Sequence, residues 1–410
     1  MDGLEEEPRR RRPRRKTRRR WCLPPAIIRE PGEMLEAAQV LQEHEGTLAL
    51  VLWTAVRDVT LWAAAAPERR ATLFSPQAEA ARRDALRLAR AEPALELSLT
   101  TLASVVSHAA QASPPVVSLV CVEVARWARQ RGSMGTAVAF AQAAAFALPE
   151  APQPALVVGQ LTVEWGRDRR AETWLRRAIG LARRVGDWET YGAAYVALGE
   201  VYVRTGRMEA APRYFQQAAR LARRQGYRYI RGEALHGLVR TSLAEGDLDA
   251  AEEYARTAQR AYGPAHARLP ELHHDVARLL MARGHHERAG SILRRLASVF
   301  TDPARRADVH ALLAYAAALL GEARPYERAW TEAWALLDAP AAAGVAPGVL
   351  RHLGHAAALR HDWLRVQQVV DRAGELGLGS REEFESLRRR LGTNGHHAGE
   401  AVNAGVGTFP

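Results

Sequence analysis

Lysine is almost absent from this chain, because Lys16 is the sole lysine among 57 basic residues. A phosphate-binding loop of the Walker type needs a glycine-rich segment that ends in lysine, and no such segment precedes Lys16. The metalloprotease pattern H-E-x-x-H and the hydrolase pattern G-x-S-x-G are missing as well. We therefore expect no catalytic residues and no cofactor, and a protein that is not an enzyme.

Cysteine is also scarce, since the chain has only Cys22 and Cys121. Two cysteines without C-x-x-C spacing provide neither a disulfide framework nor a zinc site, so a reducing cytoplasm is the expected compartment. The 14 histidines include pairs, and His352 with His355, or Glu271 with His274, would share one helical face. A metal site needs three or four ligands, and no further partner is identifiable, so we expect no bound metal.

Long uncharged apolar runs are rare, and the nearest approach extends from Thr47 to Ala66. Arg57 and Asp58 lie in its middle, where a charged pair would be costly inside a bilayer. We expect this segment to be a buried helix and not a membrane span.

Positive charge is concentrated at the start of the chain. The formal net charge is +11, and residues 1–20 contain nine arginines and Lys16 against four acidic residues. Residues 1–32 are polar and interrupted by prolines, so they are expected to form a disordered basic arm. Such an arm is either a solvated tail or a weak polyanion-binding segment through residues 9–20, and the sequence leaves both open.

A repeated pattern dominates the remainder and is clearest between Tyr195 and Ala218. Residues three or four apart share one helical face, and a glycine just beyond that face can end the helix in a left-handed conformation. Small residues on the facing stripe of a second helix would let the two helices approach closely. The copy of the pattern in this stretch comprises Tyr195, Leu198, Gly199, Tyr202, Gly206, Ala211, Phe215 and Ala218.

The same pattern recurs along the chain. Gly166, Gly206 and Gly246 are 40 residues apart, and the neighbouring seam positions move with them. These further seam positions are Ala171, Ala178, Leu238, Ala251 and Ala258. The pattern resembles that of the tetratricopeptide repeat (TPR) family, in a long-period variant similar to repeats of bacterial signalling and regulatory proteins. The resemblance implies an all-α fold, namely a right-handed α-α superhelical solenoid of TPR-like helical hairpins.

The repeats also suggest how the chain is divided. Residues 33–116 are helical but atypical and are expected to form an N-terminal capping region. Residues 117–376 are predicted to contain about seven hairpins. A capping box of Ser380 and Glu383 predicts a C-terminal capping helix over 377–391, and 392–410 is expected to be a flexible tail.

The resemblance further implies that the first helix of each hairpin lines a concave groove. Equivalent positions on successive first helices are Gln160, Glu200, His236, Arg240, His274 and Arg278. The arginines and histidines in this set could hold a peptide with acidic groups. An ordinary hydrated surface explains the same residues, and the lysines and asparagines with which some family members clamp a C-terminal carboxylate are absent here.

Two functions remain open from the sequence. The first is a non-catalytic protein–protein interaction scaffold or regulatory adaptor that binds a protein or peptide segment in this groove. The alternative is a nucleic-acid-associated regulator, in which the arginine-rich arm binds nucleic acid and the repeat array senses a ligand or mediates oligomerisation. No recognition-helix domain is visible that would read a DNA sequence.

Overall fold

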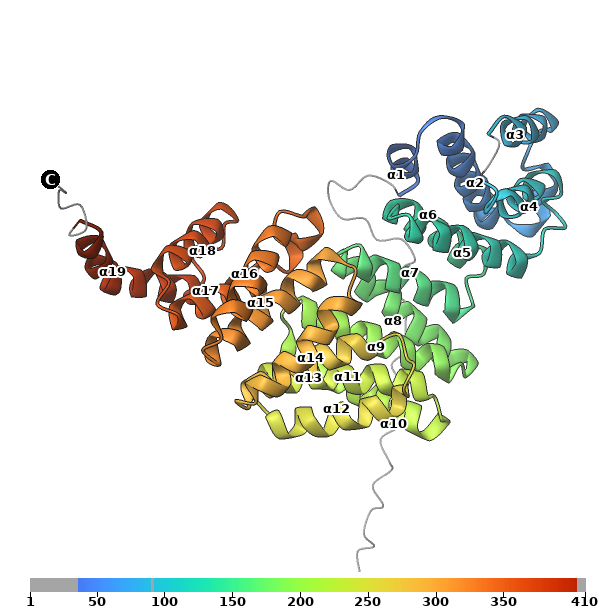
Figure 1. Ribbon diagram of the computed structural model, residues 1–410. Coiled ribbons are helices and arrows are strands. Elements are labelled where there is room, and N and C mark those ends of the chain that lie inside the picture. The colour runs from blue at the N-terminus through green and yellow to red at the C-terminus, as the bar shows by residue number, and fades with distance from the viewer. Residues whose placement is uncertain (1–35, 90–91, 404–410) are drawn as a thin grey trace, which may run out of the picture. The chain divides into compact units, whose positions relative to one another are not determined.

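The computed structural model describes residues 36–89 and 92–403 (Figure 1). Within these ranges the chain is helical and contains no β-strand, so the predicted all-α repeat fold is confirmed. The predicted basic arm of residues 1–32, its polyanion-binding stretch 9–20 and Cys22 lie outside the described residues. The chain forms two compact units, Met1–Val201 and Tyr202–Pro410, and we describe each separately.

The first unit begins with four helices of unequal length and continues with helical hairpins. Its helices are α1 (Glu36–Glu43), α2 (Gly46–Ala64), α3 (Pro76–Ala89), α4 (Glu96–Ser107), α5 (Pro114–Gln130), α6 (Met134–Ala147), α7 (Pro152–Glu164), α8 (Asp168–Val185) and most of α9 (Trp188–Arg204). Short 3-10 turns include η1 (Pro67–Thr72) in this unit. α5 packs on α6, and α7 packs on α8.

A carboxylate fixes α1 against α6. Glu43 accepts hydrogen bonds from the backbone N–H groups of Gly135 (2.7 Å) and Thr136 (2.8 Å) at the start of α6. The first N–H groups of a helix have no partner within the helix, and a negative charge is favourable there. Glu43 therefore caps the N-terminus of α6, although it is about 90 residues away in the sequence.

α2 is the one helix among the described residues that is long and apolar enough to cross a membrane by length and composition alone. In this structure 39% of its apolar window is buried against other helices. Its Asp58 is only 2% exposed and accepts hydrogen bonds from Arg57 (2.7 Å) and Arg82 (2.6 Å). This pairing offsets the cost of burying a carboxylate within a helical bundle.

The second unit continues the hairpins and ends in a long helix. Its helices are α10 (Ala211–Gln225), α11 (Arg228–Glu245), α12 (Leu248–Tyr262), α13 (Leu269–Ala282), α14 (His286–Val299), α15 (Pro303–Leu319), α16 (Ala323–Leu336), α17 (Ala346–Leu359), α18 (Trp363–Glu375) and α19 (Glu382–Asn403), with the 3-10 turns η2 (Met208–Ala210) and η3 (Pro340–Gly344). α11 pairs with α12, α13 with α14, α15 with α16, and α17 with α18.

One turn geometry ends the first helix of every hairpin from α5 to α17. Each turn contains a residue with positive φ, followed by a residue whose N–H bonds to a carbonyl five positions back. The positive-φ residues are Gly132, Gly166, Gly206, Gly246, Gly284, Gly321 and His361. The bonds run from Asp247 to Ser242 and from Asp362 to Ala357, for example, at 2.9 and 3.0 Å. This is the Schellman arrangement, which satisfies carbonyls at a helix end and favours glycine at the left-handed position.

The seam residues named from the sequence have equivalent burial in successive hairpins. Ala171, Ala211 and Ala251 are each 0% exposed, and Phe215 is also fully enclosed. Tyr195 is only half-buried, because its ring packs beside Tyr191 at the side of α9. The three repeat glycines lie in the exposed turns. The alanines thus allow close helix approach, and the glycines end the helices.

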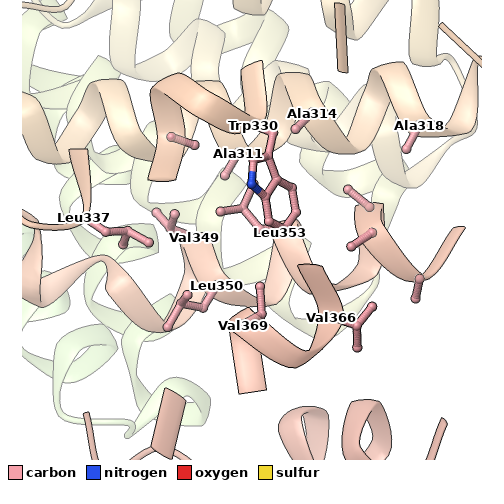
Figure 2. Close-up of a cluster of buried hydrophobic side chains, with 14 of the residues drawn as sticks. Ala311, Ala314, Ala318, Trp330, Leu337, Val349, Leu350, Leu353, Val366 and Val369 are labelled. Carbon is pink, nitrogen blue, oxygen red and sulfur yellow. The ribbon is translucent and has the colours of Figure 1, made fainter. Parts of the chain in front are cut away.

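Figure 2 shows how the same arrangement builds the core around α16. Trp330 lies between Ala311 and Ala314 of α15 and Leu353 of α17. Small residues on one helix leave room for the indole, which is 4% exposed. Aliphatic side chains from α18 complete this cluster.

The last helix, α19, extends from Glu382 through Asn403. The division into a capping helix over 377–391 and a flexible tail over 392–410 stays a prediction. Two glycines near Leu391 do not stop it, because a glycine inside a helix costs only about 1 kcal/mol. Its first turns are anchored by Phe384 and Leu387, which are fully buried against α17 and α18.

Candidate binding surface on the first helices

The first helices of the hairpins in the second unit form one connected surface. α11 contacts α13, α13 contacts α15, and α15 contacts α17. The second helices are separated by grooves, one between α12 and α14 and another between α14 and α16. We call the surface of α11, α13, α15 and α17 the first-helix surface.

A hydrogen-bonded chain connects α11, α12 and α13 at this surface. Asp275 of α13 is 5% exposed, and its carboxylate accepts a hydrogen bond from Nε2 of His236 at 3.0 Å. The other ring nitrogen of His236 lies 3.4 Å from the hydroxyl of Tyr262, which can donate to it. Arg278 donates to the second carboxylate oxygen of Asp275 at 3.3 Å.

These partners decide the charge of Asp275. Burial raises the pKa of its carboxyl, but the hydrogen bond from His236 and the nearby charge of Arg278 outweigh that effect, so the pKa lies below its ordinary value. Asp275 is therefore an anion at neutral pH. It fixes the position of Arg278 on the same helix.

A second set of contacts continues onto α15 and α17. Nε2 of His274 lies 3.1 Å from a carboxylate oxygen of Asp308. Burial raises the pKa of Asp308. The contact with His274 and the nearby His352 together lower it by more, so the pKa of Asp308 lies below its ordinary value. His352 stacks on Tyr315, with ring centroids 6.1 Å apart. Burial lowers the pKa of His352 to about 3, so this imidazole is neutral at pH 7.

The structure brings together some of the residues predicted from the sequence and separates others. His236, His274 and Arg278 meet around Asp275. Arg240 lies on α11, half-buried, one turn after His236. Gln160, exposed on α7, and Glu200, half-buried on α9, belong to the first unit.

Sequence reasoning missed the acidic members of this cluster, and it considered His352 of α17 only as a partner of His355 on one helical face. Asp275 adjoins His274 in the sequence, but it stands one position off the assumed groove register. Asp308 and His352 lie on later helices, where the repeat is looser. A search for acidic residues near the histidine positions, without a fixed 40-residue period, would have found the first two.

The chemistry of the surface is that of a polar binding site. Within residues 36–89 and 92–403, no three or more histidine, cysteine, aspartate or glutamate side chains are placed together so that they could hold a metal ion. The arginines can donate to carboxylates or main-chain carbonyls, and the Asp308 side chain, 26% exposed, can accept from a main-chain N–H.

The single described cysteine, Cys121, is fully buried in α5, and burial raises the pKa of its thiol.

The repeat geometry and the sequence lead to the same family. The family model of the MalT-like TPR region matches residues 76–339, which is more than half of the chain. The chain belongs to the MalT-like TPR family. The part of the chain that matches the family model begins at the start of α3 and ends just after α16. Its first residues fall within the segment that the sequence suggested as an atypical N-terminal cap. It includes the hairpins that carry Asp275 and Asp308.

Solved structures with the same fold include two Rap proteins. The apo form of RapI aligns with a TM-score of 0.52 at 9% identity, over 67% of this chain and 99% of RapI. The Rap conjugation gene regulator of plasmid pLS20, in complex with the Phr* peptide, aligns with a TM-score of 0.51 at 15% identity, over 82% of this chain and 97% of that regulator. At these identities the likeness shows the TPR fold. No curated protein matches the sequence.

Proposed function

We propose that this TPR protein is a non-catalytic regulatory adaptor that binds a protein or peptide segment on the first-helix surface of its second unit. The observation that carries the proposal is the anionic, buried Asp275, which links His236 of α11 to Arg278 of α13. The pLS20 Rap regulator, which shares the fold, was solved with a peptide bound and lends support.

The energetic argument starts from the cost of the cluster. A buried carboxylate is costly unless it is paired, and apolar residues in its place would stabilise helix packing as well or better. The chain nevertheless places two aspartates, two histidines and an arginine where neighbouring first helices meet. Polar groups kept at this cost are typical of a surface that positions charged side chains for a ligand.

Arg278 is the residue best placed to contact that ligand. Its side chain is 43% exposed although Asp275 holds one of its nitrogens. A guanidinium has five N–H donors in a fixed fork, so a side chain pinned at one edge still presents donors outward. Arg240 occupies the position one hairpin earlier. The pair favours a partner segment that carries carboxylates.

The test is a pull-down with the full chain as bait, followed by identification of the captured proteins. The double variant Arg240→Glu and Arg278→Glu should lose a partner that the unchanged chain captures, because two donor groups become acceptors. A matched control, Arg220→Glu and Arg224→Glu, makes the same charge change on exposed residues of α10 and should retain the partner. Equal capture by all three proteins would refute the proposal.

A further inference from the structure

A separate groove lies in the second unit, between the second helices α14 and α16. Its volume is about 480 Å³. The floor is formed by one side of α15 and the residue after it: His310, Leu313, Ala316, Ala317 and Leu320, together with Arg306. No residue of the first-helix cluster lines it, so the groove is independent of the surface proposed above.

Small residues lie beneath the groove and in one wall. Ala316 and Ala317 are only 2% and 4% exposed, so the half-buried Leu313 and Leu320 provide the accessible apolar surface on this side, and Gly290 contributes no side chain to the wall on α14. An added Cβ at Gly290 would meet only the Nη1 atom of Arg294, at 3.5 Å. Apolar surface is thus exposed in a concave site whose volume lies in the usual range of ~300–1,000 Å³ for ligand pockets.

The rim of the groove carries arginines whose charge is not neutralised. Arg294 on α14 and Arg328 on α16 are exposed, and neither has an ion pair with another residue in the described part of the chain. Arg306 lies 3.8 Å from Glu332, and Glu322 lines one end. Arg294 and Arg328 therefore contribute positive charge from the two helices that border the groove.

The groove one hairpin earlier has a more polar lining. It includes four arginines, two glutamates and His285. Two of the arginines are paired within the chain: Arg283 binds Asp249 and Glu252, at 2.5 and 3.0 Å, and Arg256 binds Glu252. The groove at α15 differs from it by its larger share of apolar lining residues.

We propose that the α14–α16 groove binds an acidic amphipathic helix of a partner protein. A helix of the partner would lie on α15 between two helices, with apolar side chains against Leu313 and Leu320 and carboxylates toward Arg294 and Arg328. Helix-in-groove recognition of this kind uses apolar anchors at i, i+3, i+4 and i+7. The protein would then have two binding surfaces.

The probe is a fluorescein-labelled amphipathic peptide of ~18 residues, about five helical turns, with leucine on one face and glutamate on the other. Its anisotropy should rise on titration with the full chain. The same peptide with lysine in place of glutamate should not bind. The double variant Arg294→Glu and Arg328→Glu should raise the Kd by about tenfold or more, because attraction becomes repulsion.

The variant Gly290→Leu tests the groove itself. The open space at Gly290 accommodates the new side chain, which fills the groove, so binding should be lost while the helical circular-dichroism spectrum is retained. The α10 control, Arg220→Glu with Arg224→Glu, should bind as the unchanged chain does. Unchanged binding by Gly290→Leu, or equal binding of the lysine peptide, would overturn the proposal. So would a dimer in sedimentation that Gly290→Leu dissociates, because the occupant would then be a second copy.

Discussion

Gly237 on α11 offers the sharpest test of how the hairpins pack. An added Cβ there would lie 2.4–2.6 Å from three atoms of the Phe215 ring, which is 0% exposed. Gly290 is also helical, but its added Cβ meets nothing closer than 3.5 Å. Replacing glycine by alanine inside a helix gains about 1 kcal/mol from helix propensity at either position. Overpacking against a ring that cannot move costs ~1–3 kcal/mol.

The gain in helix propensity is the same in Gly237→Ala and Gly290→Ala, so it cancels in the difference between their free energies of unfolding. Gly290→Ala should therefore raise the free energy of unfolding by about 1 kcal/mol, and Gly237→Ala should fall ~1–3 kcal/mol below it. Urea denaturation of the full chain, followed by circular dichroism, gives both values if the dependence on urea is unchanged between variants. Equal stability of the two variants would show that Gly237 is not required by contact with Phe215, and the seam described here would be wrong.

Three further predictions concern a turn, a buried imidazole and the seam. His361 occupies the left-handed turn position with φ 56°, so His361→Gly should stabilise the chain by about 0.5–1 kcal/mol. A lower melting temperature of this variant would mean that the ring contact of His361 with Trp363 stabilises the chain more than the backbone strain destabilises it. The pKa of His352 falls from 6.5 unfolded to about 3 folded, so its neutral form is favoured by folding and stability is lost as pH falls from about 6.5 toward 3. At pH 5 the loss of stability is about 2 kcal/mol relative to pH 7. In urea titrations at the two pH values, His352→Leu should show a free energy of unfolding that falls by about 2 kcal/mol less than that of the unchanged chain. An equal fall in both proteins would contradict the burial of this imidazole. Ala211→Leu should cost ~1–3 kcal/mol because Ala211 is 0% exposed, whereas a neutral effect would place it at solvent.

The repeat could be predicted because its signals are local. A left-handed glycine after a helical face, as at Gly206 and Gly246, marks the same turn wherever it occurs. The alanines that follow mark the positions where a second helix must approach closely. Both signals depend on backbone conformation and side-chain size, which the sequence states directly, so the all-α hairpin fold followed from them.

The candidate binding surface could be predicted only in part. The 40-residue period between Gly206 and Gly246 shortens to 38 and then 37 residues at Gly284 and Gly321. The predicted groove positions follow the first change, from His236 and Arg240 to His274 and Arg278, but they do not extend to α15 or α17. His361 holds the turn position 40 residues after Gly321 without being a glycine, and no local pattern marks it.

The sequence by itself determined the helices, their turns and the small-residue seam, because these depend on backbone preferences and on side chains three or four positions apart. Only the tertiary structure decided that Asp275 meets His236, that Asp308 meets His274, and that a groove lies between α14 and α16. Contacts between different hairpins depend on how whole helices interdigitate. A shift of one residue in register exchanges one set of neighbours for another while leaving every local signal unchanged.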